Sequence, residues 1–139
     1  MVWSPQVRRI AHKGDGGDIY QLGHPLTDDF LNFIRGRARP NTVRNYAFDL
    51  KTFFSVVTKD PTEVRPADVM AFVTAQHRPR PGVEKVVRIS DGGTGLSAAT
   101  VRRRLGAVSA FYGYLLTRAD TPVKANPVPR GLPTRRRRR

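Results

Sequence analysis

A helical repeat of apolar side chains near the end of the chain is the feature that most constrains the fold. Large apolar residues recur at three- and four-residue steps, at Val101, Leu105, Val108, Phe111, Tyr112 and Leu115. Ser97 suits the N-cap of such a helix, and Leu96 can pack onto Val101 across the first turn. The pattern predicts an amphipathic helix from about Ser97 to about Arg118, whose apolar face other helices must cover.

Three earlier segments show the same spacing, at about residues 28–36, 41–58 and 66–77. Thr27 or Asp28 can cap the first segment. Its apolar stripe comprises Phe30, Phe33 and Ile34. The stripe of the second comprises Val43, Tyr46, Leu50, Phe53, Phe54 and Val57. The third begins with a proline, which suits a first helical turn, and its inward residues would be Val69, Phe72 and Val73. The chain is therefore expected to be all-α, with four helices.

Prolines and glycines divide the chain into three expected parts. Residues 1–25 form an irregular N-terminal segment, residues 26–121 the helical domain, and residues 122–139 a linker or tail rich in proline and arginine. Within the first part, residues 7–10 and 19–22 form either a short hairpin or no regular structure.

Residues 78–95 interrupt the helical domain. Proline and glycine bracket this stretch, which indicates a loop with room for a short β-ribbon. Connections in helical bundles usually have ~2–8 residues. A loop of this length is therefore expected to be either functional or disordered.

The charge balance points to a polyanionic partner. Lys and Arg number 25 against 11 Asp and Glu, which gives a net charge of +14. Arg130 and the run Arg135–Arg139 supply six of these charges, so the rest of the chain still carries +8. Nucleic acid is the usual partner of such a surface. An acidic membrane is the rival, but no amphipathic apolar anchor accompanies the basic run.

Several other classes of protein are excluded by composition. The chain has no cysteine, which rules out disulfide frameworks, Cys-based zinc sites and thiol catalysis. No apolar run approaches the ~20 residues that a membrane span needs, and residues 1–26 lack the apolar core of a signal peptide. We expect a soluble, cytoplasmic protein with no metal, no cofactor and no small-molecule substrate.

The last helix carries the strongest candidate binding surface. It contains Arg102, Arg103, Arg104 and Arg118 and no acid, whereas a merely solvated face would have mixed signs. At ~100° per residue, Arg103 points away from the apolar stripe, and Arg104 falls nearer the core and must extend outward. Arg102 shares a flank with Gly106, Ser109 and Gly113. This flank is almost bare, so either a duplex or a packed helix can approach it closely.

Two helix starts add further candidates. Ser97 and Thr100 lie where free amides and the helix dipole favour a phosphate, although Ser97 can equally be a plain cap. On the second helix, the polar residues outside the apolar stripe are Thr42, Arg44, Asn45 and Lys51. These side chains suit base edges and phosphates, or they are solvated charges. Asn41 is either a cap or a contact.

Two strings resemble the N-terminal, SAM-like core-binding domain of the tyrosine recombinases, or phage integrases. The first is Thr42-x-x-x-Tyr46-x-x-x-Leu50-x-x-Phe53-Phe54. The second is Leu96-Ser97-x-x-Thr100-Val101-x-x-x-Leu105-x-x-Val108-x-x-Phe111-Tyr112-x-Tyr114-Leu115. The stretch Leu26-Thr27-x-x-Phe30-Leu31 and the pair Asn126-Pro127 fit the same arrangement, which extends over roughly residues 26–130.

The resemblance implies an orthogonal four-helix bundle that forms half of a C-shaped clamp around duplex DNA. In the family the second and fourth helices face the major groove, which would put Arg44, Asn45, Arg102 and Arg103 at the DNA. These recombinases work as tetramers on DNA, so other protomers are implied as partners. The implied function is DNA binding during site-specific integration and recombination.

The resemblance does not imply catalysis by this chain. The family cleaves DNA with a tyrosine nucleophile, assisted by arginines, a lysine and histidines, in a separate C-terminal domain. The motif His77-x-x-Arg80 lies in the wrong domain and is interpreted as coincidence. Three tyrosines are interpreted as core or groove-facing residues and not as nucleophiles: Tyr46, Tyr112 and Tyr114. The alternatives are a helix-turn-helix regulator, which the long stretch from Lys59 to Arg65 disfavours, and a basic RNA-binding protein.

Overall fold

The structure, a computed structural model, describes residues 3–77 and 97–131 of the chain. Its elements in chain order are β1 (Arg8–Ile10), β2 (Ile19–Gln21), α1 (Pro25–Arg35), α2 (Pro40–Val56), the short 3₁₀ helix η1 (Pro61–Glu63), α3 (Pro66–His77) and α4 (Ala98–Leu116). The four expected helices are confirmed. The expected loop at 78–95, Leu96 with its packing onto the last helix, and the run Arg135–Arg139 lie outside the described residues.

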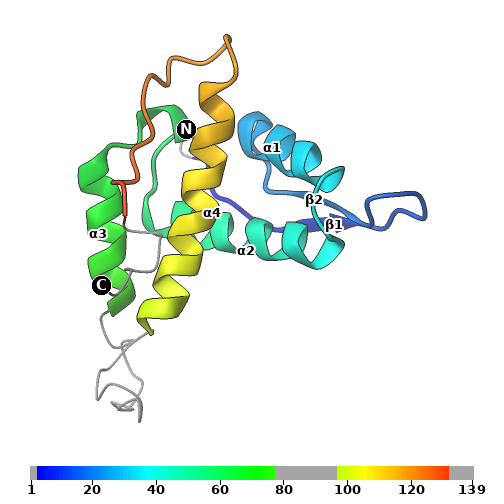
Figure 1. The fold of residues 1–139 in the computed structure, drawn as a ribbon, viewed down its shortest axis with the longest axis horizontal. Coiled ribbons are helices and arrows are strands. Elements are labelled where there is room, and N and C mark those ends of the chain that lie inside the picture. Colours follow the sequence, from blue (N-terminus) through cyan, green and yellow to red (C-terminus); the bar gives the residue numbers. More distant parts are fainter. Residues whose placement is uncertain (1–2, 78–96, 132–139) are drawn as a thin grey trace, which may run out of the picture.

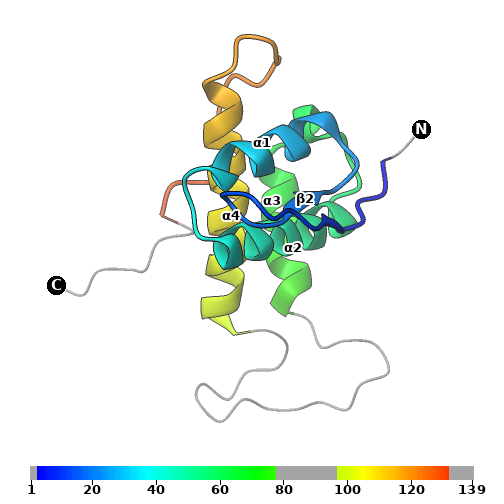
Figure 2. The same cartoon turned by 90° about the vertical axis from the view of Figure 1, so that its right-hand side faces the viewer.

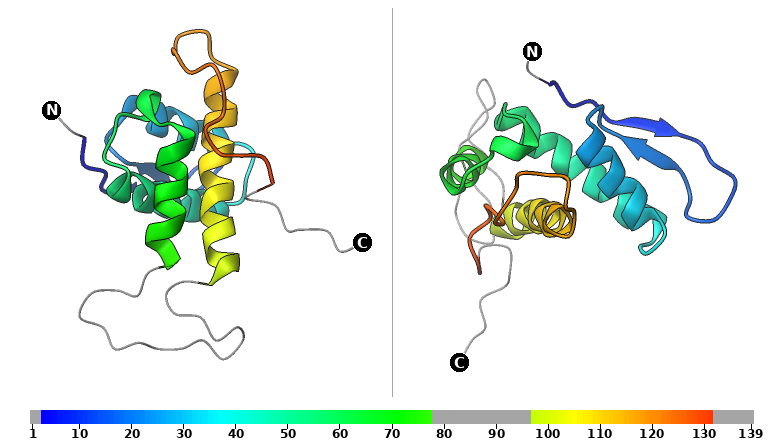
Figure 3. Two further views of the ribbon diagram at one scale, coloured as in Figure 1. Left: turned by 90° about the vertical axis from the view of Figure 1, so that its left-hand side faces the viewer. Right: turned by 90° about the horizontal axis from the view of Figure 1, so that it is seen from above.

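The helices form two crossed layers. α3 and α4 run side by side, and α2 lies across α4 (Figure 1). α1 and the hairpin lie beyond α2, and the hairpin extends away from the helices (Figure 3). The fold is therefore the orthogonal helical bundle that the sequence predicts, with a small hairpin added at its N-terminal side.

Figure 2 shows α1 and α2 in front of α3 and α4, and the hydrophobic core takes buried side chains from all four helices. Its largest fully buried side chains include Phe30, Phe53, Phe54, Phe72, Phe111 and Tyr112. The hydroxyl of Tyr112 donates a hydrogen bond of 2.6 Å to the carbonyl oxygen of Pro61, so the buried polar atom is satisfied. This contact makes Tyr112 a core residue and ties α4 to the turn after α2.

α1 differs from the prediction in its start and in one face residue. It begins at Pro25, with His24 as its N-cap, so Thr27 and Asp28 are not caps. The Asp28 carboxylate instead accepts hydrogen bonds from the backbone amides of Leu22 and Gly23. Proline supplies a helical φ at no hydrogen-bond cost in a first turn, which explains the earlier start. Phe33 was expected in the apolar stripe but is 41% exposed.

The other helix starts largely agree with the sequence. α3 has the expected bounds. α4 has Ser97 as its N-cap, with the Ser97 hydroxyl accepting from the Thr100 amide at 3.2 Å. α2 begins at Pro40 with Arg39 as N-cap and no side-chain cap bond, so the interpretation of Asn41 as a cap is wrong.

The N-terminal segment forms the hairpin that was one of two alternatives. Arg9 pairs with Tyr20 in its antiparallel register, and Gly16 and Gly17 take positive φ angles at its tip, which glycine tolerates best. Leu22, just after the hairpin, is 1% exposed. Its carbonyl accepts a 2.9 Å bond from the indole of Trp3. The segment thus adds side chains to the core.

The segment after α4 folds back along that helix (Figure 3). The Asn126 side-chain amide donates to the backbone oxygen of Ser109 at 3.0 Å and to its hydroxyl at 3.2 Å. Val128 is 5% exposed and joins the core. Buried contacts therefore continue beyond residue 121, and the expected domain boundaries stay predictions.

Candidate nucleic-acid interface

The crossing of α2 and α4 is marked by an ion pair. Asp49 of α2 is only 3% exposed, and its Oδ1 lies 3.1 Å from Nη2 of Arg103 on α4. The Arg103 side chain keeps 53% of its surface exposed. Arg103 therefore lies at the solvent edge of the crossing and is anchored from the inside.

The electrostatics of this pair follow from its burial. Burial raises the pKa of the Asp49 carboxyl, while the guanidinium groups of Arg103 and Arg104 oppose the rise. An isolated buried carboxylate is costly, and a partner within contact distance offsets that cost. The guanidinium of Arg103 therefore offsets part of the cost of burying the Asp49 carboxylate.

Two of the other candidate arginines point in different directions, and Arg118 lies just after α4, which ends at Leu116 and not at the expected Arg118. Arg104 donates to the side-chain oxygen of Gln76 on α3, so its head group reaches the neighbouring helix and does not simply extend into solvent as expected. Arg118 pairs with Asp29 of α1 at 2.9 Å and with Asp120 at 2.6 Å. The acids that α4 itself lacks are thus supplied by other segments.

Arg102 differs from these three arginines. It is half-buried, and within residues 3–77 and 97–131 it has no ion-pair partner. Its charge is therefore available to an external anion. This placement is compatible with the predicted DNA contact, which stays a prediction.

The bare flank of α4 is partly covered by the chain itself. Asn126 occupies the position at Ser109, so neither a duplex nor a second helix lies at this point of the flank. A methyl group added at Gly106 or Gly113 would meet no atom within 4 Å. These two positions remain open to an approaching backbone.

The candidates at the start of α4 form a conventional cap. The hydroxyls of Ser97 and Thr100 lie 3.0 Å apart, and the Thr100 amide is already bound to Ser97. Of the two alternatives for Ser97, the plain cap is confirmed. A phosphate contact by either residue stays a prediction.

The four candidates on α2 do not share one face. At ~100° per residue, Thr42 and Asn45 lie within about 40° of Asp49, on the side that meets α4. Arg44 and Lys51 lie roughly 140–160° from Asp49. The guanidinium of Arg44 instead stands 5.3 Å from the ring centre of Phe48. By this geometry Thr42 and Asn45 share the Asp49 side of α2, whereas Arg44 and Lys51 lie on another flank.

The α1–α2 turn carries basic residues that the sequence reasoning missed. Arg35, Arg37 and Arg39 line a shallow pocket of about 450 Å³, together with Asp15 and Gly16 of the hairpin tip. Arg35 donates to the carbonyl oxygens of Gly17 and Asp15 at 3.0 and 3.1 Å. The alternation of arginine with small residues at 35–39 is the signal that could have drawn attention to this turn. The sequence reasoning also missed Asp49. An acidic residue next to the apolar stripe of the second helix is the feature that could have pointed to it.

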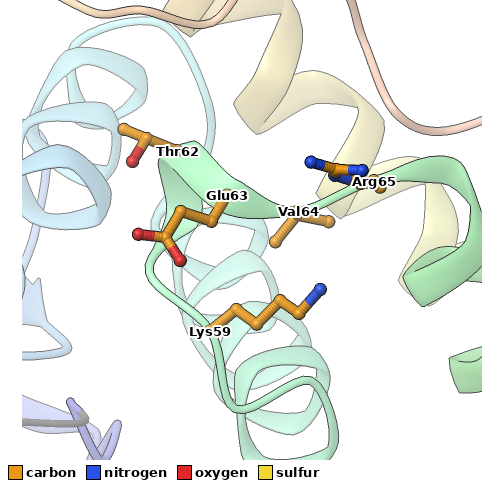
Figure 4. Close-up of a pocket in the computed structure, with 5 residues that line it drawn as sticks. All are labelled: Lys59, Thr62, Glu63, Val64 and Arg65. Atoms are coloured by element: carbon orange, nitrogen blue, oxygen red, sulfur yellow. The ribbon is translucent and has the colours of Figure 1, made fainter.

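A second pocket lies at the turn between α2 and α3. It has a volume of about 480 Å³ and is lined by Lys59, Thr62, Glu63, Val64 and Arg65. Figure 4 shows these side chains spread along the turn without converging on one point. Lys59 is paired with Asp68 at 3.0 Å. The mixture of charges gives this pocket no evident ligand.

Among the described residues there is neither a group of metal ligands nor a helix that could span a membrane. Over residues 3–77 and 97–131, no three His, Asp or Glu side chains are grouped so as to hold a metal ion. In the same part of the chain, none of the helices combines the length and the apolar character that crossing a membrane requires.

Comparison with known protein families identifies the bundle. The profile of the phage integrase N-terminal SAM-like domain matches residues 27–119. The chain belongs to this family. The integrase SAM-like domain binds DNA, and the match spans α1 to α4, including the α2–α4 crossing. No catalytic domain of the family was detected in the 139 residues. No match was found among curated proteins or among solved structures.

Proposed function

We propose that this SAM-like domain holds duplex DNA against the angle between α2 and α4, as the DNA-binding part of a site-specific tyrosine recombinase. The observation that carries the proposal is the anchored Arg103 at the crossing, next in sequence to Arg102, which has no ion-pair partner among the described residues. Thr42 and Asn45 lie on the adjoining side of α2. Together they offer one surface with charges for phosphates and donors for base edges.

The geometry of α4 supports a close approach of DNA. The open space over Gly106 follows Arg102 and Arg103 by about one turn. A sugar-phosphate backbone can therefore come near the helix without meeting side chains. The net charge of +14 would draw the duplex toward this surface at low salt.

The proposed role of the domain lies in DNA integration and recombination. In this role the domain would position DNA for strand cleavage by a catalytic domain, in company with other protomers on the same DNA. The present chain alone is expected to bind duplex without cleaving it. Residues 135–139 would add affinity without sequence preference, which falls with salt by about 0.9 log units per log unit for each phosphate neutralised.

The test measures binding of the full chain to a short fluorescent duplex by anisotropy across a salt series. The same measurement is made on the double variant Arg102→Ala/Arg103→Ala and on a chain that ends at Arg130. We expect the double variant to lose most of the affinity and the shortened chain to lose part. If only the shortening matters, binding is an effect of the tail, and the α2–α4 surface is not the DNA site.

Competition with a folded RNA tests the remaining alternative function, RNA binding. The proposal expects duplex DNA to be preferred at moderate salt. A preference for the RNA would instead favour the basic RNA-binding protein that the composition leaves open.

A further inference from the structure

The two neighbouring arginines of the proposed DNA surface differ in how they are held. Arg103 contacts a carboxylate at 3.1 Å, and that carboxylate belongs to the nearly inaccessible Asp49. Arg102 has no such partner within the described residues. Because Asp49 is packed inside the bundle, it cannot follow a moving guanidinium, and the ion pair therefore holds Nη2 of Arg103 beside a rigid point.

We propose that Asp49 is a positioning residue for DNA binding, which holds the guanidinium of Arg103 in one orientation at the α2–α4 angle. This inference rests on the proposed function. Arginine has five N–H donors in a planar fork. With Nη2 held beside Asp49, the remaining donors are confined to the solvent side of the crossing, where the duplex would lie, while Arg102 acts as a mobile charge toward phosphates.

Holding the group in place reduces the ordering cost of binding. A free surface arginine loses rotamer freedom when it binds, whereas one already fixed by its neighbours loses less. The fork geometry is also lost if lysine replaces arginine, since lysine is a point charge on a flexible stem. Arg103 should therefore be sensitive to that replacement, and Arg102 should not.

The sign of one measurement separates positioning from charge. Asp49 is an acid close to the proposed DNA surface, so charge alone predicts that its removal strengthens binding. Positioning predicts the opposite. We expect Asp49→Asn to bind a short duplex roughly tenfold more weakly in moderate salt, about the effect of one charge-assisted bond that is no longer held.

The control is a double-mutant cycle in the full chain. In an Arg103→Ala background, Asn at position 49 should cause no further loss. In an Arg102→Ala background, the loss should remain. If Asp49→Asn binds as tightly as the parent chain or more tightly, or if its effect persists without Arg103, the positioning role is wrong.

A second pair of variants decides the matter if Asp49→Asn fails to fold, as urea unfolding would reveal. Arg103 is half exposed, so Arg103→Lys should leave the fold intact. We expect it to lose most of the affinity that Arg103→Ala loses, whereas Arg102→Lys keeps most of its affinity. Equal binding by Arg103→Lys and the parent overturns the inference alone. Failure of the parent chain to bind any duplex overturns the proposed function with it.

Discussion

At the scale of single residues, His24 joins two distant parts of the fold. Its Nδ1 accepts the 3.1 Å bond from the Leu26 amide that caps α1, and its Nε2 lies 2.9 Å from the Asp60 carboxylate. Because Nδ1 accepts, the proton of the neutral ring is assigned to Nε2, which donates to Asp60. The indole of Trp3 packs against the same ring. The sequence pattern placed His24 in an irregular segment and gave no sign of these contacts.

Asp60 should make the fold sensitive to acid. Burial by itself raises the pKa of Asp60, but hydrogen bonds from Thr62 and His24 outweigh it and hold the pKa below its ordinary value of 3.8. A carboxyl with a lowered folded-state pKa stabilises the fold above about pH 4, and this stability is lost as the pH falls through the folded pKa.

We therefore expect Asp60→Asn to lower the free energy of unfolding by about 0.5–1 kcal/mol at pH 7, since the site is exposed enough for solvent to weaken it. The difference from the parent should be smaller at pH 3 than at pH 7, because the parent loses this stabilisation as the pH falls through the folded-state pKa. Urea unfolding at both pH values measures it. The pKa of Asp68 is lowered as well, so the variant should keep part of its acid sensitivity. A difference that does not change with pH would contradict this account.

At the scale of elements, α4 contains two glycines, Gly106 and Gly113. No contact in the described structure requires a glycine at either position. Glycine inside a helix costs roughly 0.5–1 kcal/mol relative to alanine. Since a methyl group at Gly106 or Gly113 meets no atom within 4 Å, folding does not explain their presence. The proposed close approach of DNA would explain Gly106, which follows the arginine pair by about one turn.

The matched variants Gly106→Ala and Gly113→Ala test this explanation. Both should raise the free energy of unfolding by about 0.5–1 kcal/mol, because helix propensity improves and no clash arises. Only Gly106→Ala should also weaken duplex binding, since its methyl group would stand between the helix and the DNA backbone. Thermal unfolding and anisotropy on the same samples provide the two readouts. Equal binding by both variants would place the DNA away from this part of α4.

At the scale of the whole molecule, the core is larger than the segment that matches the family. Leu22 precedes the matched residues 27–119 and Val128 follows them, yet both are buried in the same cluster. Parts before α1 and after α4 thus contribute side chains to the same core. The helices of the family bundle are completed here by side chains from both flanks.

Leu22→Ala should accordingly behave as a core substitution. We expect it to lower the free energy of unfolding by about 2–4 kcal/mol, through lost burial and the cavity left behind. Small domains have only about 5–15 kcal/mol in total, so the effect should be large in a urea titration. Ile10→Ala is the control, because Ile10 is 39% exposed and should change stability by no more than about 0.5 kcal/mol. A small effect at Leu22 would show that the segment before α1 is dispensable for stability.

The sequence by itself determined the elements of this protein. Apolar periodicity located all four helices, and Ser97 and Pro66 marked two of their starts, because caps and stripes depend on neighbours within one or two turns. The tertiary structure decided which side chains meet. The pairs Asp49–Arg103, His24–Asp60 and Asn126–Ser109 join different segments. A helical pattern shows which face is buried but not what lies opposite it, so the anchoring of Arg103, on which the proposed DNA surface depends, became visible only when α2 was placed across α4.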